Sequence, residues 1–308
     1  MTKKVIQIDR HKAGKFYELT RDTLSALAKS HGIKENDLEK YYETTDFYYD
    51  PNSDSKDWKY AEFLNTSGNS ISGVFFQMAA HASNTPRTAN IIKFEQNLEF
   101  LKEKLCGFDP VKLLDAYKGE ERVATLVNTL RYNEETGKGI KWSIEKSKKY
   151  KDLIMTRYCN TLLTCAEYLK NFNDRGDVIT DLYRHYENTD CKSLIKYFVD
   201  KTAYGQTLAC DCLKEMDKKF SFLCKPDIHI IDTMNALYGK IAKNIYDYIE
   251  EMQCLVEQIN AVNDKEQITV YRLDKMIWLV CSGNFYLDKP ENAKKIYLEK
   301  IVNGTYYA

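Results

Sequence analysis

Apolar residues recur at three- and four-residue spacing along most of the chain. Across residues 16–30 they fall at Phe16, Leu19, Leu24, Leu27 and Ala28. This spacing places side chains on one face of an α-helix. No window combines alternation of apolar and polar residues with β-branched enrichment, so the pattern predicts no strand. The expected fold class is all-α, with irregularly packed helices.

Turn-forming residues predict where helices begin and end. Asn84-Thr85-Pro86 interrupts an apolar region, and Pro86 is expected in the first turn of a new helix because proline lacks an amide hydrogen. Asp109-Pro110 predicts a second start, with Asp109 as the N-cap. Later helices are expected over residues 230–258, with a break near Gly239, and over residues 270–282.

Residues 48–58, YYDPNSDSKDW, form the densest run of turn-forming residues. We expect this run to lie near the end of an N-terminal helical arm, residues 1–70. Residues 71–308 are then long enough to bury a core of their own. We expect them to form a helical domain, with two helical subdomains around a cleft in the complete fold.

Charge and cysteine content narrow the classes of partner. The 308-residue chain has 45 basic and 45 acidic residues, so its zero net charge gives no bulk attraction to nucleic acid or membrane. No apolar run approaches the ~18 residues of a membrane span, and the first residues lack the apolar core of a secretory leader. The nine cysteines contain no C-x-x-C pair. We therefore expect a cytoplasmic protein with reduced thiols, no metal site and no membrane contact.

A tight turn between two helices is predicted within residues 193–216. The segments SLIKYFVD, KTAYG and QTLACDCLKEM read as helix, turn and helix. Gly205 is expected to take the left-handed backbone conformation. The N–H groups that begin the second helix can bind an anion such as a DNA phosphate. A plain corner between interior helices is the alternative.

This hairpin, followed about twenty residues later by KPDIHIID, resembles the helix-hairpin-helix DNA glycosylase superfamily. In that family a Gly-apolar-Gly hairpin precedes a loop whose aspartate is essential for base excision. The resemblance implies a glycosylase-like fold with Asp227 as the catalytic residue. It extends to GVFFQMAAHASNTPRTANIIKFEQNLEFL, FDPVKLLDA and YRLDKMIWLVCSG, and covers roughly Ser72 to Gly283. Ala203 stands in place of the first hairpin glycine.

The resemblance also implies two further groups of site residues. Residues of the hairpin, with the lysines that flank it and Asp227, are expected to contact DNA: Lys201, Ala203, Tyr204, Gly205, Gln206, Thr207 and Lys225. Residues of the early helix and the turn after it are expected to contact an extruded base: Phe76, Gln77, His81 and Asn84. Gln206-Thr207 stands where bifunctional members carry a lysine nucleophile, which implies hydrolysis without strand cleavage. No iron–sulfur ligand spacing is present, so no cofactor is expected.

A fixed carboxylate suits hydrolysis of an N-glycosidic bond. Positive charge develops on the deoxyribose as the base departs, and a carboxylate can stabilise that charge and orient the attacking water. Asp227 can equally be the N-cap of a helix that starts at Ile228. A basic cluster between Lys138 and Lys151 can be a DNA track or a solvated helix face.

Three functions stay open from the sequence. The first is a monomeric, monofunctional DNA glycosylase that acts on a damaged or modified base extruded from double-stranded DNA, in DNA repair or in antiphage defence against modified viral bases. The second is a non-catalytic helical protein that binds nucleic acid or another partner. The third is a helical domain that binds a small molecule through a tyrosine-rich surface.

Overall fold

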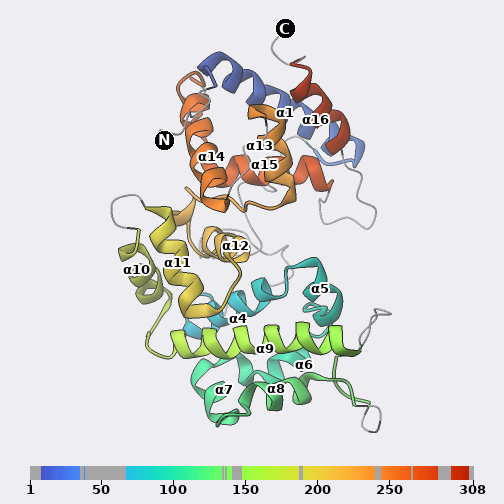
Figure 1. Ribbon diagram of the computed structural model, residues 1–308, viewed down its shortest axis with the longest axis vertical. Coiled ribbons are helices and arrows are strands. Elements are labelled where there is room, and N and C mark those ends of the chain that lie inside the picture. The colour runs from blue at the N-terminus through green and yellow to red at the C-terminus, as the bar shows by residue number, and fades with distance from the viewer. Residues whose placement is uncertain are drawn as a thin grey trace. The chain divides into compact units, whose positions relative to one another are not determined.

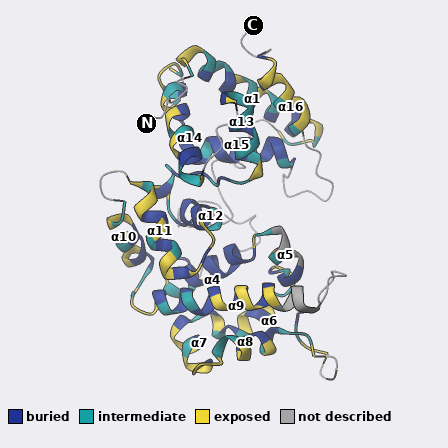
Figure 2. Ribbon diagram, viewed as in Figure 1, coloured by how far each residue is buried: buried dark blue, intermediate teal, exposed yellow. Residues whose placement is uncertain are grey.

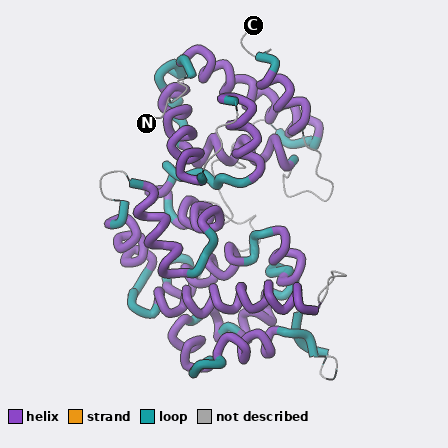
Figure 3. Tube along the Cα trace, in the orientation of Figure 1, coloured by secondary structure: helices purple, strands orange, loops and turns teal. Residues whose placement is uncertain are grey.

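The computed structural model describes residues 8–34, 38, 67–133, 135, 137–140, 148–186, 190–239, 244–264, 266–283 and 293–304. Every regular element within these ranges is a helix (Figure 3). The described β-pairs are isolated bridges, such as that between Ser70 and Asp174. The predicted all-α class is therefore confirmed. Contacts divide the chain into two compact units, residues 1–45 with 218–308 (unit 1) and residues 46–217 (unit 2).

Unit 1 joins the N-terminal helix to the C-terminal helices. Its elements are α1 (Arg10–Ser30), η4 (Lys218–Phe220), α13 (Ile228–Tyr238), α14 (Ile245–Asn260), α15 (Val270–Ser282) and α16 (Lys294–Val302). Helix α1 packs against α14 and α15, and α13 packs against α14, α15 and α16 (Figure 1). The apolar face of α1, including Phe16 and Leu24, is fully buried. Residues 1–45 thus share a unit with residues 218–308, a division that differs from the predicted boundary at residue 70.

Unit 2 is built around one long helix, α9. Its elements are α4 (Ile71–Ala82), α5 (Pro86–Ile92), α6 (Leu98–Lys104), η2 (Cys106–Phe108), α7 (Pro110–Ala116), α8 (Arg122–Leu130), α9 (Lys148–Leu169), α10 (Arg175–Arg184), α11 (Cys191–Thr202) and α12 (Gln206–Met216). Helices α4, α5, α7, α8 and α11 all pack on α9. Helix α4 is buried over most of its length (Figure 2). The polar side chains of Gln77 and His81 on α4 therefore lie in the interior of unit 2.

Several predicted helix boundaries are confirmed. Pro86 is the first residue of α5, and the Thr85 side chain caps that helix. Asp109 caps α7 by accepting hydrogen bonds from the amides of Val111 and Lys112, both at 3.0 Å. Helix α15 spans Val270–Ser282 as predicted. Gly239, with φ of 73°, ends α13 at the predicted break.

Two predictions fall partly or wholly outside the described residues. These are the turn-rich stretch at residues 48–58 and the part of the basic cluster at residues 141–147. No helix in the described part of the chain is long and apolar enough to cross a membrane.

Candidate functional site

The predicted hairpin is present in unit 2, between α11 and α12, but its backbone differs from the prediction. Ala203 follows α11 in the left-handed conformation, with φ of 58°, and its N–H donates to the carbonyl of Val199 at 3.0 Å. Gly205 is extended, with φ of −72° and ψ of 148°, and is the N-cap of α12. The prediction of a left-handed Gly205 is therefore wrong. Ala203, the residue that ends α11, is left-handed instead. This conformation costs about 1 kcal/mol for a residue that has a Cβ.

The turn is anchored to the core of unit 2. The Tyr204 hydroxyl donates to the carbonyl oxygen of Met78 on α4, and the Tyr204 ring lies 5.5 Å from that of Phe198. From α9, the Thr161 hydroxyl donates to the carbonyl of Ala203 at 3.5 Å. Burial raises the pKa of Tyr204 well above its ordinary value. Tyr204 therefore holds the hairpin in place, and the packing does not favour its predicted contact with DNA.

The start of α12 is open to a ligand. Gly205 provides no side-chain cap for α12, and a Cβ added to Gly205 would meet no atom within 4 Å. Ala203, Gly205 and Gln206 are exposed, while Thr207 is half-buried. Lys201 is exposed too, with its ammonium 5.5 Å from the centre of the Tyr197 ring. Because the first N–H groups of a helix carry partial positive charge, this opening suits an anion.

A groove of about 640 Å³ runs beside the hairpin within unit 2. Thr85 and Thr88 line it from α5 and its cap, Arg157 and Asn160 from α9, and Gly205 from the hairpin. Arg157 and Asn160 are exposed. Arg157 could not be predicted from the sequence, because no local spacing connects this position on α9 with the hairpin. The groove brings a guanidinium to the same hollow as the open end of α12.

Two of the four predicted base contacts have structural partners inside unit 2. The Phe76 ring is fully buried and meets the ring of Phe108 at 5.0 Å. The Gln77 side chain is also fully buried, with its amide nitrogen donating to the carbonyl of Glu215 at 2.7 Å. Its amide oxygen accepts from Arg175 Nη1 at 2.9 Å. The sequence suggested that a polar Gln77 in an apolar helix needs a base edge, but interior groups satisfy it.

The other two predicted base contacts lie at the end of α4. His81 is 1% exposed, and its Nδ1 is 3.6 Å from a carboxylate oxygen of Asp211. The Asn84 side-chain nitrogen is 3.4 Å from the same Nδ1. Asn84 is exposed in the turn before α5. Asn84 thus lies at the surface, where it can reach a base. Base contact by the buried Phe76, Gln77 and His81 stays a prediction that the packing does not favour.

Asp227 lies in unit 1, at the N-terminus of α13. Its Oδ1 accepts hydrogen bonds from the amides of His229 and Ile230, at 2.8 and 3.3 Å. The alternative that Asp227 is an N-cap is therefore correct as a description of its local structure. Both of these bonds use one carboxylate oxygen, and the side chain is half-buried. Ile228, the next residue, is 60% exposed. Capping thus fixes the carboxylate without covering this end of the helix.

His229, on the first turn of α13, is influenced by several charged groups of unit 1. Burial lowers the pKa of His229; Lys294 and Lys225 lower it further, while Asp227 and Asp232 oppose the change. Its imidazole is therefore neutral at neutral pH. The Nδ1 atom of His229 is buried and contacts no hydrogen-bond partner among the described residues. Asp232 forms an ion pair with Lys294 at 2.7 Å.

A thiol lies in the same neighbourhood. Cys281 of α15 is buried, with its sulfur 3.9 Å from the Thr233 hydroxyl. Burial raises its pKa to about 11, so it is a protonated thiol at neutral pH. Among the described residues, no group of three or more His, Cys, Asp or Glu side chains is placed to hold a metal ion. The protonated thiol leaves the side chains of Asp227 and Asp232 as the carboxyl groups of this cluster.

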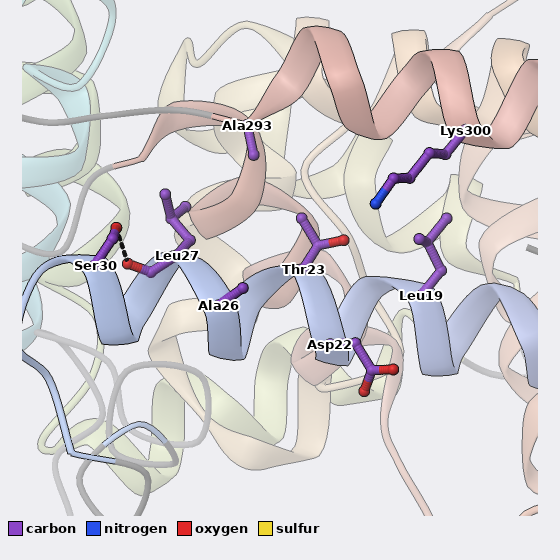
Figure 4. A pocket seen from close by; sticks show the side chains of 8 residues that line it. All are labelled: Leu19, Asp22, Thr23, Ala26, Leu27, Ser30, Ala293 and Lys300. Atoms are coloured by element: carbon purple, nitrogen blue, oxygen red, sulfur yellow. Dashed lines mark hydrogen bonds between the residues drawn. The ribbon is translucent and has the colours of Figure 1, made fainter.

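Unit 1 also contains a shallow hollow of about 420 Å³ between α1 and α16 (Figure 4). Lys300 extends from α16 toward Leu19 and Thr23 of α1, while Asp22 points away from α16. Aliphatic and small side chains make up most of the remaining lining. This hollow offers no pair of groups suited to acid–base chemistry.

Comparisons of the chain with protein-family models, with curated proteins and with solved structures found no match.

Proposed function

We propose that this protein is a monofunctional DNA glycosylase that hydrolyses the N-glycosidic bond of a damaged or modified base. The observation that carries the proposal is the placement of Asp227. This half-buried carboxylate is fixed by two amides through Oδ1 alone, beside a neutral His229. A carboxylate held in this way needs no reorientation when positive charge develops on a sugar.

In the proposed reaction, Asp227 acts on a nucleotide that has left the base stack. Extrusion costs a few kcal/mol and is easiest for a base that pairs poorly. As the C1′–N bond lengthens, the carboxylate stabilises the positive charge on the deoxyribose. It also orients the water that attacks C1′ and accepts a proton from it. The products are a free base and an abasic site.

The hairpin of unit 2 supports the DNA-binding part of the proposal. The open N-terminus of α12 can donate backbone hydrogen bonds to a phosphate, and Arg157 in the adjoining groove can pair with another. Lys201 adds an exposed ammonium at the end of α11. The chain therefore offers positive groups at and near the hairpin although its formal net charge is zero.

A second candidate function is non-catalytic binding of nucleic acid through the hairpin alone. The two capping bonds of Asp227 favour it, since they already give this residue a structural role. In that case the hairpin variants described below change DNA affinity, while substitution of Asp227 changes neither affinity nor the DNA itself.

We expect hydrolysis without strand cleavage, because Gln206 and Thr207 occupy the start of α12 where a lysine nucleophile would stand. The protein is incubated with duplexes that contain uracil, hypoxanthine, 8-oxoguanine or 5-hydroxymethylcytosine. Free base is measured by chromatography, and nicks are measured before and after alkali. Release of a base with alkali-dependent nicks is the expected result. A covalent adduct after borohydride reduction would instead identify an amine nucleophile and contradict the monofunctional assignment.

DNA affinity is expected to fall steeply with salt, although the chain is neutral overall. Each phosphate that the protein neutralises adds about 0.9 to the slope of log affinity against log salt. Replacing Lys201 or Lys225 by alanine should therefore flatten the slope by roughly one unit for each phosphate that the variant no longer binds. Binding titrations over a salt series measure this change.

The matched control for this titration is Lys118→Ala. Lys118 is exposed and forms a surface ion pair with Asp115 at 2.9 Å, so its removal should leave the slope unchanged. Equal slopes for the wild type and the Lys201 and Lys225 variants would show that neither lysine contacts phosphate.

A further inference from the structure

The ion pair between Asp232 and Lys294 attaches a lysine of α16 to α13, the helix that Asp227 caps. His229 and Asp232 are three residues apart on α13, so they share one face of that helix. Lys294 belongs to α16, which packs against α13, and its ammonium meets Asp232 at 2.7 Å. Besides burial, which lowers the pKa of His229 and raises that of Cys281, the positive charge of Lys294 lowers the pKa of both groups. Asp227 is the N-cap of α13, and Asp232 lies five residues further along, about 8 Å along the helix axis. The ammonium paired with Asp232 is therefore within about one and a half turns of the Asp227 end of α13.

Helix stability does not account for a lysine at this position. Lys294 is the first residue of α16, a helix with no side-chain cap and no acidic residue in its first turn. A cation at a helix N-terminus is unfavourable, because the helix dipole is positive there. The pair with Asp232 is partly exposed, with the Lys294 side chain 22% accessible. Pairs of this kind contribute little to folding stability.

Cleavage of an N-glycosidic bond has two charge requirements. The sugar becomes positive and needs an anion, which Asp227 provides in the proposed mechanism. The departing base receives the electron pair of the C1′–N bond and needs a hydrogen-bond donor or a cation. The ion pair with Asp232 holds the ammonium of Lys294 on α13, where it can serve this second requirement.

We infer that Lys294 is a second catalytic residue, which donates a hydrogen bond from its ammonium to an acceptor atom of the departing base. This inference rests on the proposed glycosylase function. The C1′–N electron pair goes to the base, and the oxygen of water bonds to C1′. Water loses one proton to Asp227, and the released base takes up one from solvent, so Lys294 keeps its own. Asp232 acts as a positioning residue that holds the ammonium.

The test compares leaving groups. A panel of duplexes containing uracil, hypoxanthine, 8-oxoguanine or 5-hydroxymethylcytosine first identifies a base that the wild type releases. Single-turnover rates are then measured for that base and for a fluorinated counterpart of the same ring, which is a better leaving group. Lys294→Met should slow release of the ordinary base ~100-fold and slow the fluorinated base much less. Lys294→Arg should restore most of the rate, because it keeps a cationic donor.

Lys295→Met is the matched control, since Lys295 is the exposed neighbour of Lys294 on α16, and its rates should equal those of the wild type. Two results would overturn the inference and leave base excision by Asp227 intact. In the first, Lys294→Met slows release of both bases equally. In the second, the rate falls only as far as the variant's lower free energy of unfolding explains. Failure of the wild type to release any base of the panel would instead count against the proposed function, and the inference would fall with it.

Discussion

Asp227→Asn should retain the fold of the protein and lose base release by at least ~100-fold. Asparagine is as good an N-cap as aspartate, so the amides of His229 and Ile230 keep an acceptor at the start of α13. The variant lacks the negative charge that stabilises the sugar cation and the basicity that accepts a proton from water. Single-turnover release of free base, measured by chromatography, gives the loss directly.

Asp109→Asn is the matched control for that experiment. Asp109 caps α7 in unit 2 by the same geometry, accepting from the amides of Val111 and Lys112. The two variants should therefore unfold at nearly the same denaturant concentration as the wild type, and only Asp227→Asn should lose activity. Undiminished release by Asp227→Asn would remove this residue from the mechanism and favour the role of a plain cap.

Arg175→Met is expected to destabilise unit 2 by about 3–5 kcal/mol, because three buried acceptors lose their donor. Arg175 is buried, and its Nε donates to the carbonyl of Gly68 at 2.6 Å. Its Nη1 donates to Gln77 Oε1 at 2.9 Å and to the carbonyl of Met216 at 2.8 Å. Methionine fills part of the volume but leaves these buried acceptors without their donor, and each unpaired acceptor costs about 1–3 kcal/mol.

Denaturant unfolding followed by circular dichroism measures this effect. The control is Arg184→Met, because Arg184 lies on the same helix, α10, and is exposed. We expect its free energy of unfolding to stay within about 0.5 kcal/mol of the wild type. A loss below about 1 kcal/mol for Arg175→Met would show that other donors replace the guanidinium.

Local chemistry made several helix boundaries predictable. Pro86 and Asp109 mark helix starts through properties of a single residue, and the apolar spacing of residues 270–282 matched α15. The conformation of the hairpin was harder to predict. Whether Ala203 or Gly205 becomes left-handed depends on the residue at which α11 ends, and spacing fixes such an end only to within a few residues.

Long-range contacts explain what the sequence did not reveal about the candidate site. Gln77 looked like an unsatisfied polar group because its partners, Arg175 and Glu215, are distant in the chain. Arg157 joins the hairpin groove, and Lys294 joins Asp232, through packing between helices that no local pattern encodes. Asp227 was predictable because its role depends on a short motif, although that motif does not separate capping from catalysis.

The division of unit 1 into residues 1–45 and 218–308 has a consequence for synthesis on the ribosome. Helix α1 is synthesised more than 200 residues before α14 and α15, which cover its apolar face. At about 5–20 residues per second, residues 31–282 take roughly 13 to 50 seconds to translate. During this interval unit 2 can fold by itself, while Phe16 and Leu24 have no native partners. Until α14 and α15 are made, the apolar face of the nascent helix α1 is thus open to chaperones, proteases and aggregation.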